Sequence, residues 1–268
     1  MDILNPTSIE SLAIVLAEQL YQTDLTEKWW AVSKAAEKYE ARLIASLKDL
    51  FAEQEKEVLR RVNSRSPGKG IKAPGDAWLF DPKEWQPVFE NAGKPVIVGA
   101  LLEGGNTTLA DLGMGVNFNA TRPEVQEFIA KKVPKFSFDV NETTLNDLRR
   151  EFKAGLDAGE GIKLIEKRVE KVFGFTEKFR NKRIAQTEIM GAMNKGGHEG
   201  LVQSGVVKEK VWISTRDNLT RDSHRKMDGE HVPLKQKYSN GLMYPGDWTG
   251  RAEEIINCRC TDTAYSFN

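Results

Sequence analysis

The chain has 268 residues, of which 40% are hydrophobic and 29% charged, and its 39 basic and 39 acidic side chains leave no formal net charge. This balance is typical of a globular protein with a sizeable core, and it excludes a global attraction to nucleic acid or to an anionic membrane. No window approaches 18 uninterrupted apolar residues, so we expect no membrane partner. The two cysteines stand only two residues apart, make no disulfide framework and favour synthesis in the reducing bacterial cytoplasm.

The first third of the chain has helical periodicity. Apolar residues recur at helical spacing over 8–21 and again over 27–62, with lysine and glutamate between them. Thr26 is the candidate N-cap of the second helix. A helix of more than about 30 residues is longer than is typical of globular domains, so we expect it to pack along a neighbour.

A linker is the first expected domain boundary. The serine, proline and glycine content of 63–75 predicts a loop, and its stretch from Pro67 to Pro74 predicts mobility. We therefore expect a helical arm over 1–65, a linker and helical segment over 66–120, and a further domain over 121–268.

Prolines and glycines interrupt the helical pattern in the middle of the chain. The helix over 85–112 is expected to break at Pro95 and at the Gly104-Gly105 pair. The helix after it is expected to end at Pro134, and Asn141 is the candidate cap of the next helix. Further helices are predicted over 161–173 and 176–195.

The last 65 residues change in character. Alternating apolar residues and turn residues predict a short helix capped by Thr220, a helical turn over 251–256, and short strands over 209–214, 230–234 and 258–264. The expected fold class is therefore α+β, in which a long helical N-terminal part is followed by a small mixed α+β C-terminal module.

Four ordered segments then carry a resemblance. They are 140–144 with 158–162, 183–188 (RIAQTE) with 194–197, 217–224 (DNLTRDSH) with 227–229, and 245–247 with 257–261 (NCRCT). In this order they resemble the phage head morphogenesis family of Mu F-like minor head proteins, from about residue 120 to the end. Gln186 stands where that family usually carries arginine.

The resemblance implies a minor head protein of a tailed phage or prophage, and not an enzyme. Such a protein associates with the portal vertex or the capsid interior during procapsid assembly and DNA packaging or delivery. The implied partners are the portal protein and a major capsid or scaffold protein. The implied location is the virion, after synthesis in the cytoplasm of the host bacterium.

Cys258 and Cys260 are candidate zinc ligands. On a strand their thiols point to the same face, and His224 supplies a third ligand. Asp228 is the candidate fourth ligand, with Asp217 and His231 as alternatives. In the competing interpretation both thiols pack as small apolar groups, and His224 bonds a carboxylate or a backbone group.

Polar residues in the motifs admit two interpretations. We expect a lattice of Arg–Asp pairs and turns that fixes the shape of the module, formed by Asp217, Thr220, Arg221, Asp228, Gly229, Asp247, Asn257 and Arg259. Alternatively, His224 acts as a general base beside Asp217 or Asp228, in a metal-dependent hydrolase or nuclease-like effector. The sequence has no HExxH motif and no glycine-rich phosphate loop, which favours the structural interpretation.

A basic stretch over 163–183 is the candidate contact to DNA or to an acidic face of a partner. Three acidic residues oppose its eight basic ones, which are Lys163, Lys167, Arg168, Lys171, Lys178, Arg180, Lys182 and Arg183. Because no aromatic residues alternate with these charges, any DNA contact is expected to be non-specific. A solvated helix face is the alternative.

Aromatic residues in the first third are either core residues or an interface. They are Trp29, Trp30, Trp78, Phe80, Trp85 and Phe89. Core packing is the usual role of such residues, whereas an exposed subset marks a protein interface. The sequence leaves this choice open.

Overall fold

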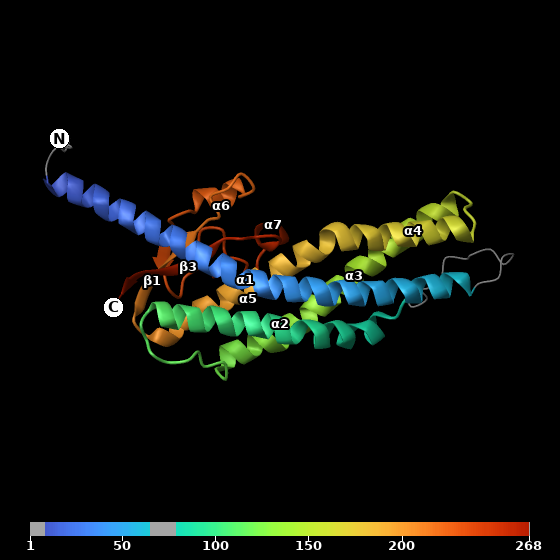
Figure 1. Ribbon diagram of the computed structural model, residues 1–268, viewed down its shortest axis with the longest axis horizontal. Coiled ribbons are helices and arrows are strands. Elements are labelled where there is room, and N and C mark those ends of the chain that lie inside the picture. The colour runs from blue at the N-terminus through green and yellow to red at the C-terminus, as the bar shows by residue number, and fades with distance from the viewer. Residues whose placement is uncertain (1–8, 65–78, 268) are drawn as a thin grey trace.

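The computed structural model describes residues 9–64 and 79–267, with side chains from residue 24 onward, and it confirms the α+β class (Figure 1). The helical part comprises α1 (Ile9–Asn63), α2 (Pro82–Asp111), α3 (Pro123–Asp157), α4 (Ile162–Phe175), the π-helical turn η2 (Thr176–Arg180) and α5 (Asn181–Ser204). The C-terminal module comprises β1 (Val207–Ile213), α6 (Asp222–Lys226), β2 (His231–Pro233), α7 (Ala252–Ile255) and β3 (Thr261–Phe267). The predicted mobile stretch over 67–74 and Trp78 lie outside the described residues.

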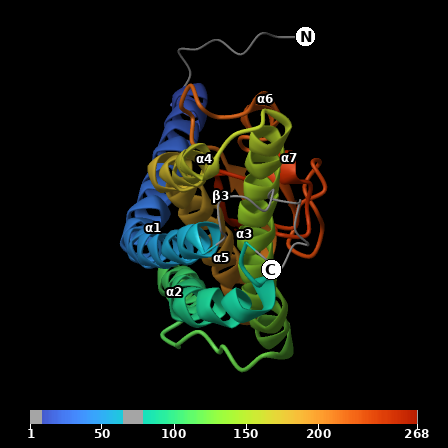
Figure 2. The ribbon, with the colours of Figure 1, turned by 90° about the vertical axis from the view of Figure 1, so that its right-hand side faces the viewer.

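The long helices run along the longest axis of the molecule, and the strands gather at one end (Figure 1). A view along that axis shows α1 to α5 grouped as a bundle (Figure 2). None of the described helices combines the length and apolarity that a membrane span requires.

One hydrophobic core joins all five long helices. Its fully buried side chains include Leu43 of α1, Phe89 of α2, Phe136 of α3, Val169 of α4 and Ile189 of α5. Side chains from both sides of residues 65 and 120 therefore share one core, and the domain boundaries drawn there remain predictions.

The expected break within the first helix is absent. The backbone of α1 continues from Ile9 to Asn63, so Thr26 lies inside the helix and caps nothing. Leu25 is buried against the sheet residues Val211 and Ile213. This tertiary packing accounts for continuous helix where the sequence pattern predicted an interruption.

The expected breaks at proline are also absent. Pro95 lies inside α2 and Pro134 inside α3. Each proline costs one backbone hydrogen bond, but buried residues on both sides of it hold the helix in place. Asn141 is not a cap either. Its side chain donates to the Ser137 carbonyl (2.9 Å) and accepts from the Gln54 amide (3.0 Å), which links α3 to α1 inside the core.

Glycines allow α2 and α5 to cross closely. A Cβ atom on Gly104 would overlap the carbonyl oxygen of Met193, and one on Gly196 would overlap that of Leu101. The Gly104-Gly105 pair is therefore part of a close backbone approach between two helices and does not break α2.

The small sheet places the C-terminal module against α1. Its order is β2-β1-β3 with both neighbours antiparallel to β1, and Ile213 is paired with Thr261. Successive residues of β1 face opposite sides, so Ile213 packs on α1 while Trp212 packs into a separate cluster with Cys258 and Cys260. That second cluster holds the residues described next.

Candidate metal centre and neighbouring grooves

A turn organised by Asp217 places His224. The Asp217 carboxylate accepts from the Leu219 backbone N–H (3.0 Å) and the Thr220 hydroxyl (3.0 Å), and it pairs with Arg259. Thr220 therefore belongs to this turn and does not cap α6, because the N-cap position of α6 is occupied by Arg221. The short helix that follows turns the His224 ring inward, where it is fully buried.

The two cysteines lie just before β3 and not within it, which corrects the expected strand. Asn257 adopts a left-handed conformation (φ 60°), and its N–H donates to the Thr187 hydroxyl (2.8 Å). The Asn194 side chain donates to the Cys260 carbonyl (2.8 Å), which anchors the segment to α5. Although Cys258 and Cys260 are not on a strand, both thiols face His224.

His224 and the two thiols form a compact donor set. The Nδ1 atom of His224 lies 3.6 Å from the Cys258 Sγ and 3.5 Å from the Cys260 Sγ, and all three atoms lie within 4.8 Å of one another. A tetrahedral zinc ion with bonds of about 2.0–2.3 Å places its ligand atoms roughly 3.3–3.8 Å apart. The donor types and spacing therefore fit zinc.

The surroundings favour a thiolate at Cys260. A hydrogen bond from Cys258 and the facing His224 ring lower the pKa of Cys260 to about 5, and the Thr215 backbone N–H adds to this effect. The same hydrogen bond, together with burial, raises the pKa of the Cys258 thiol well above its usual value. Backbone N–H groups directed at sulfur are a typical outer shell of thiolate ligands.

Glu254 orients the histidine. Its carboxylate lies 2.9 Å from the Nε2 atom of His224, on the side away from the thiols. Burial opposes ionisation of Glu254, but hydrogen bonds from Asn240, His224 and Ser223 lower its pKa overall. A carboxylate on the second ring nitrogen is the usual partner of a metal-bound histidine. Sequence reasoning missed Glu254, and its position four residues before Cys258 was the only available signal.

The side chains expected to supply a fourth ligand are engaged elsewhere. Asp228 accepts from the Ser214 backbone N–H (2.8 Å) and pairs with Arg216 (2.8 Å). Asp217 binds Arg259, and His231 stacks on a tyrosine ring at the edge of the sheet. Over the described ranges, no other histidine, cysteine, aspartate or glutamate joins these three residues as a fourth donor. Asp228 therefore lies outside the donor set, and its role as a ligand stays a prediction.

The expected Arg–Asp lattice is present in part. Arg216 pairs with Asp228, and Arg259 pairs with Asp217. Arg221, in contrast, donates to the backbone carbonyl of Ile256. The remaining motif residues shape turns: Asp247 accepts from the Met243 N–H (3.1 Å) and the Thr249 hydroxyl (2.8 Å), and Gly229 has a positive φ of 83°.

The basic stretch divides into engaged and exposed side chains. Arg180 is buried and donates to the Thr144 hydroxyl (2.8 Å) and the Val140 carbonyl (2.7 Å), so its expected contact with DNA is wrong. Arg168 pairs with Glu151 (2.9 Å) and Glu160 (2.6 Å). The others are exposed: Lys163, Lys167, Lys171, Lys178, Lys182 and Arg183.

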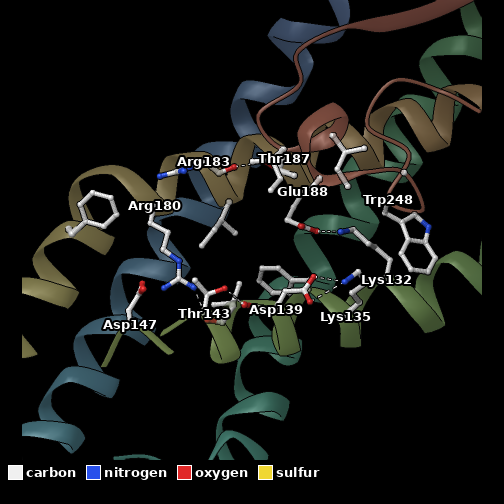
Figure 3. A pocket seen from close by; sticks show the side chains of 18 residues that line it. Lys132, Lys135, Asp139, Thr143, Asp147, Arg180, Arg183, Thr187, Glu188 and Trp248 are labelled. Atoms are coloured by element: carbon white, nitrogen blue, oxygen red, sulfur yellow. Dashed lines mark hydrogen bonds and ion pairs between the residues drawn. The ribbon is translucent and has the colours of Figure 1, made fainter. Parts of the chain in front are cut away.

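Two grooves adjoin the first turns of α5. One has a volume of about 460 Å³ and lies between α3, α5 and the segment from Trp248 to Ile256 (Figure 3). A buried ion pair between Lys132 and Glu188 (2.7 Å) lines it. The other, with a volume of about 890 Å³, lies between α1 and α5. None of the three donor residues lines either groove.

The aromatic residues of the first third are partly buried and partly exposed. Phe80, Trp85 and Phe89 are buried in the main core. Trp29 donates from its indole nitrogen to the Arg259 carbonyl (2.8 Å), which ties α1 to the C-terminal module. Trp30 is exposed and lines the larger groove.

Comparison with known proteins gives two matches. Residues 146–263 match the sequence model of the family described as Phage Mu protein F like protein. The uncharacterized protein YqbB of Bacillus subtilis (strain 168) is 28% identical over 112 residues, a match that spans 39% of this chain and only 36% of the relative. No solved structure matches the chain.

The family match contains the whole donor set. It begins inside α3, includes α4 and α5 and ends inside β3, so it also contains the turn organised by Asp217. Over residues 146–263, which include this site, the chain is similar to the Phage Mu protein F like family.

Proposed function

We propose that this chain is a minor head protein of a tailed phage or prophage, associated with the portal or the capsid interior during procapsid assembly and DNA packaging or delivery. The observation that carries this proposal is the family match over residues 146–263. The proposed partners are the portal protein and a major capsid or scaffold protein, and the proposed location is the virion. A role in assembly agrees with a C-terminal module whose polar residues mostly fix turns and bind backbone groups.

Association with the portal is tested by sedimentation. The portal protein from the same genome is co-expressed with this chain, and the mixture is separated on a density gradient. The proposal expects both proteins in the fast fractions of the portal oligomer. It is contradicted if the portal sediments as an oligomer while this chain stays in the slow fractions.

Non-specific contact with DNA is the smaller part of the proposal. The exposed basic side chains on α4, η2 and the start of α5 support it, since phosphate contacts need accessible cations. Burial of Arg180 and the ion pairs of Arg168 reduce the basic set that the sequence offers. We therefore expect DNA to contribute less than a protein partner.

We also propose that His224, Cys258 and Cys260 hold a zinc ion. When bound, zinc would cross-link α6 to the segment that leads into β3, two parts of the module that share one small hydrophobic cluster. Glu254 would fix the orientation of the His224 ring. The fourth ligand would be a water molecule, because none of the described acidic, histidine or cysteine side chains joins the set.

A metal-dependent hydrolase is the second candidate function. Three protein ligands with a free fourth position favour it, since catalytic zinc sites have this composition. Against it, His224, Cys258 and Cys260 are each at most 3% exposed, which leaves a substrate no access to the ion. Glu254, a carboxylate that could otherwise act as a general base, already binds His224. A structural ion is therefore the better-supported use.

A further inference from the structure

Exposed apolar side chains gather beside the start of α5. Within the described residues, five of the twelve exposed large apolar side chains line the two grooves. They are Trp30, Phe175, Phe179, Leu219 and Ile256, of which Leu219 is 77% and Trp30 61% exposed. Solitary exposed apolar residues are ordinary, but several around a concave surface mark an interaction site.

The two grooves meet at a common wall. Arg183 and Ile256 line both of them, so the hollow in Figure 3 and the larger hollow beside α1 lie on either side of these two residues. Phe175 lies at the first groove and Phe179 at the second, and their rings pack together with centroids 5.4 Å apart. The exposed apolar residues are therefore neighbours and not a scattered set.

The larger groove has charged walls of opposite sign. Glu37 and Glu40 lie on the α1 side, whereas Lys182 and Arg183 lie on the α5 side. Among the described side chains, no carboxylate lies within ion-pair distance of Lys182 or Arg183. Arg221 also lines the groove and donates to a backbone carbonyl, so its charge is not neutralised by a carboxylate. The α5 side therefore offers cations to an acidic ligand.

The walls also indicate which backbone conformation fits. All the residues that line the larger groove belong to helices or loops, and none belongs to a strand. A bound peptide therefore finds no strand edge with which to pair, which favours an occupant with internal backbone hydrogen bonds, such as a helix.

We propose that these grooves bind an amphipathic helix of a partner protein, with its apolar stripe on Trp30, Leu219 and Ile256 and its acidic flank against Lys182 and Arg183. Apolar anchors at helical spacing supply most of the affinity in such complexes, and flanking charges set orientation and specificity. The proposal is independent of the role in phage heads and of the zinc ion.

Three synthetic peptides of about 18 residues test this proposal, a length that gives roughly five helical turns. All carry leucine at positions i, i+3, i+4 and i+7, and their flanks carry glutamate, glutamine or lysine. Fluorescence anisotropy measures binding to the full chain. The glutamate peptide is expected to bind about tenfold more tightly than the lysine peptide, with the glutamine peptide between them.

Matched variants locate the binding surface. Leu219→Ser should weaken all three peptides, and Lys182→Glu should reduce the preference for the glutamate flank. Leu164→Ser and Lys163→Glu make the same chemical changes on the exposed face of α4, outside both grooves, and should change neither result.

Several results would overturn the proposal. The first is that no peptide binds, and the second is that the three peptides bind with equal affinity whatever charge their flanks carry. A third is an equal loss of binding in the α4 variants. If no peptide binds and the chain forms a dimer that Leu219→Ser dissociates, the occupant is a second copy of this chain, which also contradicts the proposal.

Discussion

The His224 ring lies between the two cysteine sulfur atoms and a carboxylate, and each of its two nitrogens faces one of these partners. Its Nδ1 faces Cys258 and Cys260, and its Nε2 faces Glu254. The spacing of the two cysteines, together with the position of His224 in the segment DNLTRDSH, predicted these three donors from the sequence. Glu254 and the Thr215 N–H were not predictable from the sequence. Glu254 is placed by the helical turn before Asn257, and Thr215 follows the end of β1. No sequence motif encodes the geometry of either segment.

The zinc proposal predicts a graded response to substitution. Purified protein never exposed to chelator should contain about one zinc ion per chain, measured by elemental analysis. Cys260→Ser removes a ligand and should abolish zinc binding, while far-ultraviolet circular dichroism shows that α1 to α5 remain folded. Glu254→Gln leaves the ligands in place and should weaken zinc affinity by roughly 10–100-fold.

Two controls separate this site from general damage to the module. Asp228→Asn breaks the pair with Arg216 but touches no donor atom, so the protein should keep its zinc. His231→Gln changes an exposed histidine outside the set and should behave in the same way. Zinc well below one ion per chain in the unaltered protein rules out the site.

A second histidine is buried without a partner for one of its ring nitrogens. His198 on α5 stacks on Tyr244, and its Nδ1 has no hydrogen-bond partner among the described residues. Burial, together with the nearby charges of Lys210 and Lys195, lowers the pKa of His198 to about 3. The unfolded chain therefore takes up this proton near pH 6.5, whereas the folded chain does not until about pH 3.

This difference predicts a loss of stability in acid. As pH falls from 6.5 toward 3, the unfolded state gains a proton that the folded state excludes, which costs about 2 kcal/mol at pH 5. His198→Phe keeps the ring stacking and removes the proton site. Urea unfolding should therefore show a smaller loss of stability between pH 7 and pH 5 in this variant than in the unaltered protein. His231→Gln is the control, and an equal effect of both variants would contradict the assignment to His198.

At the scale of the elements, prolines and glycines in the helical part were the least reliable predictors of where helices end. Pro95 and Pro134 predicted helix ends, yet both lie inside long helices whose neighbours are buried. The Gly104-Gly105 pair predicted an interruption, yet it marks the crossing of α2 over α5. Local propensity favours a break at such residues, but packing against other helices decides the outcome, and packing is not visible in a single sequence.

The helix crossing gives a matched pair of glycine substitutions. Gly196→Ala would push a methyl group into the backbone of α2 and should destabilise the protein by about 1–3 kcal/mol or more. Gly174→Ala, in α4, meets open space and should be neutral or stabilise by roughly 0.5–1 kcal/mol. Thermal and urea unfolding measure both. Equal effects of the two substitutions would mean that α2 and α5 do not approach closely.

At the scale of the whole molecule, the α+β class and the order of its two parts were predictable. Helical periodicity was strong over the first third, and alternating residues with glycine and proline turns were dense in the last 65 residues. The sequence did not predict that α1 packs with α2 to α5 in one core and contacts the sheet through Leu25. Those contacts join residues nearly 200 positions apart, beyond the reach of periodicity. The arrangement places the donor set and both grooves where the helical bundle meets the C-terminal module.

The central claim is that this chain is a component of a phage head, and mass spectrometry of purified particles tests it most directly. Procapsids and DNA-filled heads from the same lysate are separated on a density gradient, digested and quantified against the portal and major capsid proteins. The account predicts peptides of this chain in at least one particle class, at a few copies per portal. Absence from both classes, with portal and capsid peptides abundant in the same fractions, would contradict it.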